Sequence, residues 1–173
     1  HGTDRGLVAG LLGMRPDDER IPDSFEIARK MGLSYSFGIA NLTSAHPNSV
    51  VLEVKGKSGR TLEVQACSLG GGRIMINRLD GLDVNCSCEI PTLIVHNLDQ
   101  PGHVAEVTSM LAHKSVNIAN MSLYRDKRGG SAVMVVEMDQ PLPKESLEWL
   151  EHREGIVKVT YINVTEGEED DVL

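Results

Sequence analysis

The residues best suited to chemistry lie in one short loop, Asn97-Leu98-Asp99-Gln100-Pro101-Gly102. Gly102 permits close approach to the backbone, and the amides that follow, including that of His103, lie where a helix is expected to begin. Amides at a helix start bind a carboxylate, while Asn97, Asp99 and Asn117 offer polar atoms to an ammonium group. The loop therefore has the chemistry of a site for a free amino acid. The alternative, which residue types alone favour, is that Asp99 only caps the helix and Gly102 only serves the turn.

A second candidate is the opening tetrad His1-Gly2-Thr3-Asp4. A glycine and a hydroxyl residue at a helix start can present free backbone amides to an anion, aided by the helix dipole. The alternative is that Thr3 is simply the N-cap of the helix. The tetrad is therefore a candidate for part of an anion or substrate cleft.

The three cysteines allow a metal hypothesis, which the spacing does not favour. Cys86 and Cys88 are two residues apart on one predicted strand and so point to the same face, and Cys67 could supply a third ligand across the sheet. Zinc and iron–sulfur sites usually take four ligands, so the interpretation as small buried hydrophobes is preferred and no metal ligand is assigned. Their odd number argues against a disulfide framework and suggests a reducing cytoplasm.

Catalytic and polyanion-binding patterns are absent from the sequence. Gly56-Lys57-Ser58 imitates the end of a P-loop, but the required earlier glycine is replaced by Val51. The six histidines are scattered without a neighbouring nucleophile, so no catalytic residue is assigned. The net charge of −8 includes five acidic residues near the end, and no basic stripe suits nucleic acid. No apolar stretch approaches the roughly 20 residues of a membrane helix.

The elements that must position these residues fall into two halves that meet near Ile90. The first half reads as two helices, around Leu7 to Leu12 and from about Ile21 to Met31, and then an alternating strand from Leu33 to Ile39. An antiparallel sheet follows, with a type I′ turn predicted at Asp80-Gly81 because both residue types tolerate positive φ. Its strands are expected at Val50 to Lys55, Thr61 to Leu69, Arg73 to Leu79 and Leu82 to Cys88, with a bulge or close backbone approach at Gly70-Gly71-Gly72.

The second half reads as strand, helix, strand, strand, helix, strand, which is the ferredoxin-like order. Pro101 and Pro143 open the two helices, and the four strands are expected at 91–97, 116–124, 132–138 and 156–164. Such a sheet has helices on one face only. Its other face must be solvated or packed on another sheet, which makes a dimer plausible.

These motifs resemble a known family. Residues 91–164 resemble an ACT domain, with Asn97 to Gly102 and Ser115-Val116-Asn117-Ile118 matching its hallmark stretches. The first half resembles the β subunit of bacterial iron–sulfur L-serine dehydratases, in His1 to Asp4, Leu7 to Leu12, His46-Pro47-Asn48 and Ser68 to Ile74. It is also similar to the allosteric substrate-binding domain of some phosphoglycerate dehydrogenases, but the chain has no Rossmann glycine fingerprint.

The resemblance implies an α+β protein. Residues 1–89 form an α/β allosteric-substrate-binding-like domain with an antiparallel sheet, 90–164 an ACT domain, and 165–173 a disordered acidic tail. The family's Ser-Ser-Ser-His-Thr segment, which lies upstream of the tetrad, is not in the sequence, so the first domain is expected to be truncated at its N-terminus.

The resemblance also implies a division of labour. The family converts L-serine to pyruvate and ammonia, with a [4Fe-4S] cluster held by cysteines of a partner α subunit. The β subunit frames the substrate cleft and carries regulation, so this chain alone is expected to be inactive. Its ACT half is expected to form a homodimer and to bind L-serine or a similar amino acid through Asn97, Asp99, Asn117 and the amides near Gly102 and His103. The alternative function is a stand-alone amino-acid-sensing module.

Overall fold

The computed structural model describes residues 2–43 and 45–164. The chain divides into two compact units, residues 1–44 and 45–173. His1 and the predicted acidic tail lie outside the described residues. No helix of the described part is long and apolar enough to cross a membrane.

The first unit is a small helical pair. It contains α1 (Thr3–Leu11), the short 3-10 helix η1 (Ile21–Asp23) and α2 (Ser24–Met31). Val8 and Ala28 are buried, and the Ser24 hydroxyl donates to the Arg5 carbonyl at 3.1 Å. The predicted second helix is thus confirmed, although its first turn, which holds Pro22, is 3-10. It ends at Gly32, whose φ of 75° is the left-handed conformation that glycine adopts without steric cost.

The strand predicted from Leu33 to Ile39 is wrong. No strand is assigned between residues 33 and 43 of the described chain. The alternating aromatic side chains instead pack on α2, with ring centroids 5.3 Å apart for Phe25 and Tyr35 and 5.6 Å apart for Tyr35 and Phe37. A lone extended segment without a neighbour leaves its backbone groups unpaired, so alternation by itself does not make a strand.

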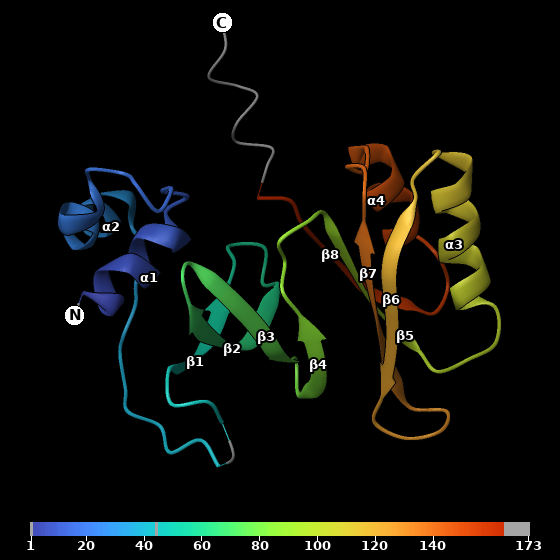
Figure 1. The fold of residues 1–173 in the computed structure, drawn as a ribbon, viewed down its shortest axis with the longest axis horizontal. Coiled ribbons are helices and arrows are strands. Elements are labelled where there is room, and N and C mark those ends of the chain that lie inside the picture. Colours follow the sequence, from blue (N-terminus) through green and yellow to red (C-terminus); the bar gives the residue numbers. More distant parts are fainter. Residues whose placement is uncertain (1, 44, 165–173) are drawn as a thin grey trace, which may run out of the picture. The chain divides into compact units, whose positions relative to one another are not determined.

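The second unit begins with an antiparallel four-stranded sheet of order β1-β2-β3-β4 (Figure 1). The bounds are β1 Ser49–Lys55, β2 Thr61–Gly70, β3 Arg73–Leu79 and β4 Leu82–Cys86. Asp80 and Gly81 both have positive φ, 45° and 82°, as the predicted turn between β3 and β4 requires. The register also shifts between Ser68 and Gly70, so the predicted irregularity at the glycine run is confirmed.

A second antiparallel sheet follows, of order β6-β7-β5-β8, with two helices. Its elements run in the predicted order: β5 Thr92–Leu98, α3 His103–His113, β6 Ile118–Arg125, β7 Ser131–Met138, α4 Lys144–Glu151 and β8 Ile156–Ile162. Leu93 and Val136 of the sheet pack with Leu111 of α3 and Leu150 of α4 in one fully buried core. The predicted α+β class and the ferredoxin-like half are therefore confirmed.

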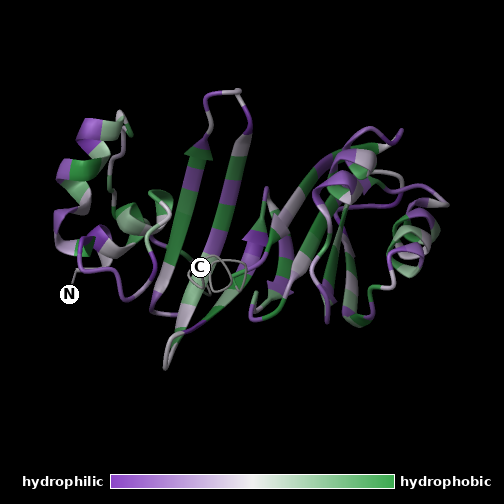
Figure 2. Ribbon diagram, turned by 90° about the horizontal axis from the view of Figure 1, so that it is seen from above, coloured by the Kyte–Doolittle hydropathy of each residue, from purple (hydrophilic) through white to green (hydrophobic). Residues whose placement is uncertain are grey.

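The other face of this second sheet packs on the first sheet. Ile94 and Val135 share a buried cluster with Ile76 and Val84. Hydrophobic and hydrophilic bands alternate along strands of the unit, as expected where one face of a strand is buried (Figure 2). The predicted boundary between residues 89 and 90 falls between these two sheets, and its status as a domain boundary stays a prediction. This face is therefore covered by a sheet of the same chain.

Candidate functional site

The candidate loop lies between the end of β5 and the start of α3. Gly102 precedes the helix with φ 104° and ψ −31°, and a Cβ built on it would meet nothing within 4 Å. No side chain of the described residues caps α3, so the alternative role of Asp99 as the cap is wrong. The first amides of an uncapped helix carry partial positive charge and need an acceptor. The loop therefore keeps donors for a ligand oxygen.

Asp99 ties the loop to the hairpin between β6 and β7. Its Oδ2 accepts hydrogen bonds from the Gly129 amide at 2.9 Å and the Arg125 guanidinium at 3.1 Å. The Gly129 amide, with the charge of Arg125, holds the pKa of Asp99 below its usual range. Asp99 is thus a carboxylate at neutral pH.

Two polar side chains near the loop are buried and incompletely paired. Asn97 is 4% exposed; its Nδ2 donates to the Leu98 carbonyl at 2.6 Å, while its Oδ1 has no partner among the described residues. His103 is 8% exposed, and its Nε2 likewise has no partner in the described chain. Its Nδ1 lies 3.6 Å from Glu106 Oε2. Buried polar atoms without partners are costly, and they are common where a ligand completes the hydrogen bonding.

Asn117 is not beside this loop in the same copy of the chain. It precedes β6, whereas Asp99 follows β5, and both strands are antiparallel to β7. The eight residues of β6 separate these two ends of the sheet by roughly 25 Å. Asn117 Nδ2 instead donates to Asp139 Oδ2 at 2.6 Å, and the backbone N–H of Asn117 donates to Gln140 Oε1 at 2.7 Å. The expectation that Asn117 points into the same crevice is therefore wrong within one copy.

The opening tetrad starts α1, but not in the predicted way. Gly2, with φ 79°, precedes the helix, and Thr3 is its first residue rather than its N-cap. Within the described chain, α1 has no side-chain cap, and Asp4 Oδ1 accepts a hydrogen bond from the neighbouring Arg5 amide at 2.9 Å. Among the described residues the helix start is uncapped, as an anion-binding role requires, and the substrate-cleft role of Gly2, Thr3 and Asp4 stays a prediction.

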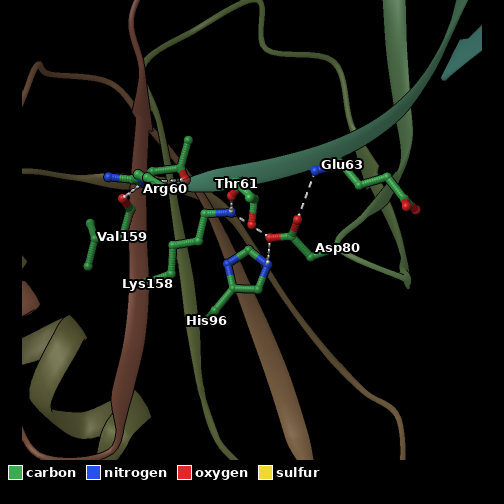
Figure 3. A network of polar contacts seen from close by, with 8 residues as sticks. Arg60, Thr61, Glu63, Asp80, His96, Lys158 and Val159 are labelled. Atoms are coloured by element: carbon green, nitrogen blue, oxygen red, sulfur yellow. Dashed lines mark hydrogen bonds and ion pairs between the residues drawn. The ribbon is translucent and has the colours of Figure 1, made fainter. Parts of the chain in front are cut away.

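Sequence reasoning missed a polar cluster between the two sheets, shown in Figure 3. Asp80, in the β3–β4 turn, places Oδ2 2.7 Å from Lys158 Nζ and 3.2 Å from His96 Nε2. Its Oδ1 accepts the Glu63 amide at 2.9 Å, and Lys158 also donates to the Thr61 carbonyl at 2.6 Å. The cluster lines a hollow of about 390 Å³ and links a turn of the first sheet to β5 and β8 of the second.

Burial and charge set the ionisation of this cluster. Burial lowers the pKa of His96, despite the nearby Asp80 carboxylate. Burial opposes ionisation of Asp80, but the Glu63 amide and Lys158 outweigh it and hold the pKa below its usual range. A neutral imidazole therefore faces an ion pair at neutral pH. The signal in the sequence was His96 itself, which alternates with Thr92 and Ile94 on an inward face.

The cysteines do not form a cluster of three. Cys86 and Cys88 place their sulfurs 3.2 Å apart in the buried core between the sheets. Cys67 lies on β2, paired with Met75 of β3. No group of three or more His, Cys, Asp or Glu side chains among the described residues is placed to hold a metal ion.

Comparison with known proteins shows which families this chain is similar to. The ACT domain family matches residues 91–151. The chain is 37% identical over 143 residues to the L-serine dehydratase β chain of Peptoniphilus asaccharolyticus, covering 82% of this chain and 64% of that protein. It is 33% identical over 162 residues to a probable L-serine dehydratase β chain of Bacillus subtilis, covering 94% of this chain and 73% of the relative.

The chain belongs to the L-serine dehydratase β-chain family. A more distant similarity, 25% identity over 162 residues, links it to the D-3-phosphoglycerate dehydrogenase of Bacillus subtilis and covers 30% of that enzyme. The predicted relationship is thus confirmed. The chain spans 64% and 73% of the lengths of the two β-chain relatives, so the activity of those complete proteins is only proposed for this chain.

Proposed function

We propose that this chain is the β subunit of an L-serine dehydratase, a lyase that converts L-serine to pyruvate and ammonia. Its similarity to two proteins named as β chains supports the assignment and the need for an α subunit. In this proposal the chain helps to frame the substrate cleft, through its N-terminal unit, and carries an amino-acid-responsive ACT site. With three free cysteines, it fits a reducing cytoplasm.

The proposal assigns bond breaking to the partner subunit. The family resemblance implies a [4Fe-4S] cluster, which would act as a Lewis acid on the substrate hydroxyl. Even a cluster that left one iron open for the hydroxyl would need three thiolates around it, but the described residues offer one close sulfur pair and a separate Cys67. These cysteines do not fit the cluster, so its ligands are placed on the α subunit and none is assigned here.

The regulatory site is proposed at the β5–α3 loop. The uncapped start of α3 supplies donors for the carboxylate of an amino acid, and Asp99 supplies a negative charge for its ammonium group. Asn97 and His103 have buried polar atoms that such a ligand could pair directly or through water. The uncapped helix beside an ionised carboxylate is the observation that carries the proposal, because together they match both charges of a zwitterion.

A homodimer would bring Asn117 to this site from the second copy. β6 is an edge strand, and Leu123 on it is 52% exposed. If two β6 strands pair antiparallel about Met121, Asn117 of one copy faces Arg125 of the other. Arg125 in turn contacts Asp99. Each of the two equivalent sites would thus contain Asp99 from one copy and Asn117 from the other.

Mixing two variants that are each defective in serine binding tests this shared site. Asp99→Asn and Asn117→Ala should each abolish or weaken binding of L-serine, because each homodimer has two defective sites. After the two variants are unfolded and refolded together, heterodimers should contain one site intact and one doubly defective. Partial recovery of wild-type affinity supports the shared site, whereas a mixture that binds no better than its components contradicts it.

An activity assay tests the division between subunits. We expect no pyruvate from the chain alone and pyruvate from its mixture with a cysteine-bearing α subunit under anaerobic conditions. The stand-alone sensor, supported by the ACT match alone, predicts binding of L-serine without activity in the mixture. Pyruvate formation by the purified chain alone would contradict both.

A further inference from the structure

The buried sulfur pair of Cys86 and Cys88 has no part in the proposed function. Cys86 is the last residue of β4, and Cys88 lies two residues later in the segment that leads to β5. Cys88 has φ 56°, a left-handed conformation that is uncommon for residues other than glycine. In a regular strand, two side chains at this spacing point to the same face but are held apart. Here the two sulfurs approach to 3.2 Å. The chain therefore brings the two thiols together at a turn in its path.

The distance between the sulfurs and the side chains around them bear on which chemistry the two thiols can undergo. Two thiolates on one tetrahedral zinc ion lie about 3.8 Å apart, given zinc–sulfur bonds near 2.3 Å. A disulfide brings the sulfurs to about 2.05 Å. The observed 3.2 Å lies between these two values, and the described residues supply no third ligand for a metal ion, so a disulfide is the chemistry that the pair supports. The sulfurs need to move only about a further 1.2 Å to bond.

The surroundings make one of the two thiols the better nucleophile. A hydrogen bond from Cys88 holds the pKa of Cys86 below its usual value, although burial opposes this. The same contact, together with burial, raises the pKa of Cys88. Thiolate character favours Cys86 as the first sulfur to react. Both residues are buried, at 1% and 6% exposure, so only a small oxidant can reach them.

We propose that Cys86 and Cys88 form a reversible disulfide when the chain meets a small oxidant such as hydrogen peroxide. The Cys86 thiolate attacks the peroxide and becomes a sulfenic acid as hydroxide leaves. The Cys88 sulfur then attacks the oxidised sulfur, loses its proton and expels water. In sum, two S–H bonds are replaced by one S–S bond, and the two electrons and two protons convert the peroxide to two water molecules.

The position of the pair gives this modification a consequence. The loop it closes is very short, so the bond adds little stability by restricting the unfolded chain. The bond would instead fix the segment between β4 and β5, within the core where Cys86 and Cys88 pack with Ile94 and Val133. The redox state of the pair would thus change how firmly this segment is held at the junction of the two sheets, without involving the residues of the amino-acid site.

Thiol counting on the native protein tests the proposal. After treatment with hydrogen peroxide and removal of the excess, we expect the chain to fall from three free thiols to one, to lose about 2 Da, and to yield a peptide that links residues 86 and 88. Dithiothreitol should restore all three. Cys67→Ser is the matched control and should still lose two thiols, whereas Cys88→Ser should form no intrachain bond.

Three outcomes overturn the proposal. The first is that three thiols persist in the folded protein at oxidant levels that oxidise an exposed cysteine. The second is that the mass rises by stable oxygen additions, and the third is that Cys67 is found in the disulfide. Circular dichroism of Cys67→Ser and Cys88→Ser shows whether each variant is folded, and the wild-type thiol count decides the question without either variant.

Discussion

Replacement of Gly155 by alanine should disturb the floor of the candidate loop. Gly155 has φ 80°, and a Cβ built on it would lie 2.5 Å from two atoms of the His103 ring. Its carbonyl also accepts the Leu98 amide at 2.9 Å, so this one residue meets both ends of the loop. The left-handed backbone costs alanine about 1 to 2 kcal/mol, and displacement of a packed ring costs about 1 to 3 kcal/mol. We therefore predict a loss of about 2 to 5 kcal/mol in the free energy of unfolding.

Urea denaturation followed by fluorescence of Trp149 measures this loss. Trp149 is the single tryptophan of the chain and lies on α4, which packs beneath the same sheet. Gly59→Ala is the matched control: φ is 85° and nothing lies within 4 Å of the added Cβ, so only the backbone cost of about 1 to 2 kcal/mol applies.

The double variant His103→Ala, Gly155→Ala isolates the ring contact. Removal of the ring relieves the clash, so the double variant should lose less stability than the sum of the single variants. If Gly155→Ala is no more destabilising than Gly59→Ala, or if the two single effects simply add, the described packing of His103 on Gly155 is refuted.

Three further predictions concern the charged groups. Because burial lowers the pKa of His96 in the folded chain, the unfolded chain takes up a proton at a higher pH, so the free energy of unfolding should fall as the pH drops through about 6.5. The urea midpoint should therefore be lower at pH 5.5 than at pH 7.5, and this decrease should be smaller for His96→Gln than for the wild-type chain. Lys158→Met removes the ammonium from Asp80 and the Thr61 carbonyl and should cost about 1 to 3 kcal/mol in the same denaturation assay, and an unchanged midpoint would mean the cluster contributes nothing. Arg125→Ala should raise the pKa of Asp99 in an NMR titration yet leave it below the usual value, because the Gly129 amide remains, and an unchanged pKa would contradict the contact.

The second half of the chain was predictable because its local signals agree with its tertiary contacts. Apolar runs, prolines at helix starts and a recognisable loop gave the order of six elements, and the structure has the same order. The Asp80-Gly81 turn was predictable for a similar reason, since its backbone conformation is set by the residues themselves.

The parts that could not be predicted depend on contacts between distant residues. The alternation from Leu33 to Ile39 carries no information about whether a neighbouring strand exists, and here the aromatic rings pack on Phe25 instead. Likewise, Asn117 and Asp99 occur in two hallmark stretches separated by one helix, but strand direction puts them at opposite ends of the sheet. The cluster of Asp80, His96 and Lys158 joins residues 78 positions apart, which no local pattern records.

Calorimetric titration of L-serine into the purified chain tests the central claim most directly, with the state of association measured on the same sample by sedimentation. We predict a saturable site with one serine per chain and two per dimer, and an affinity reduced in both Asp99→Asn and Asn117→Ala. A dimer that binds neither L-serine nor a related amino acid would contradict an amino-acid site at the start of α3.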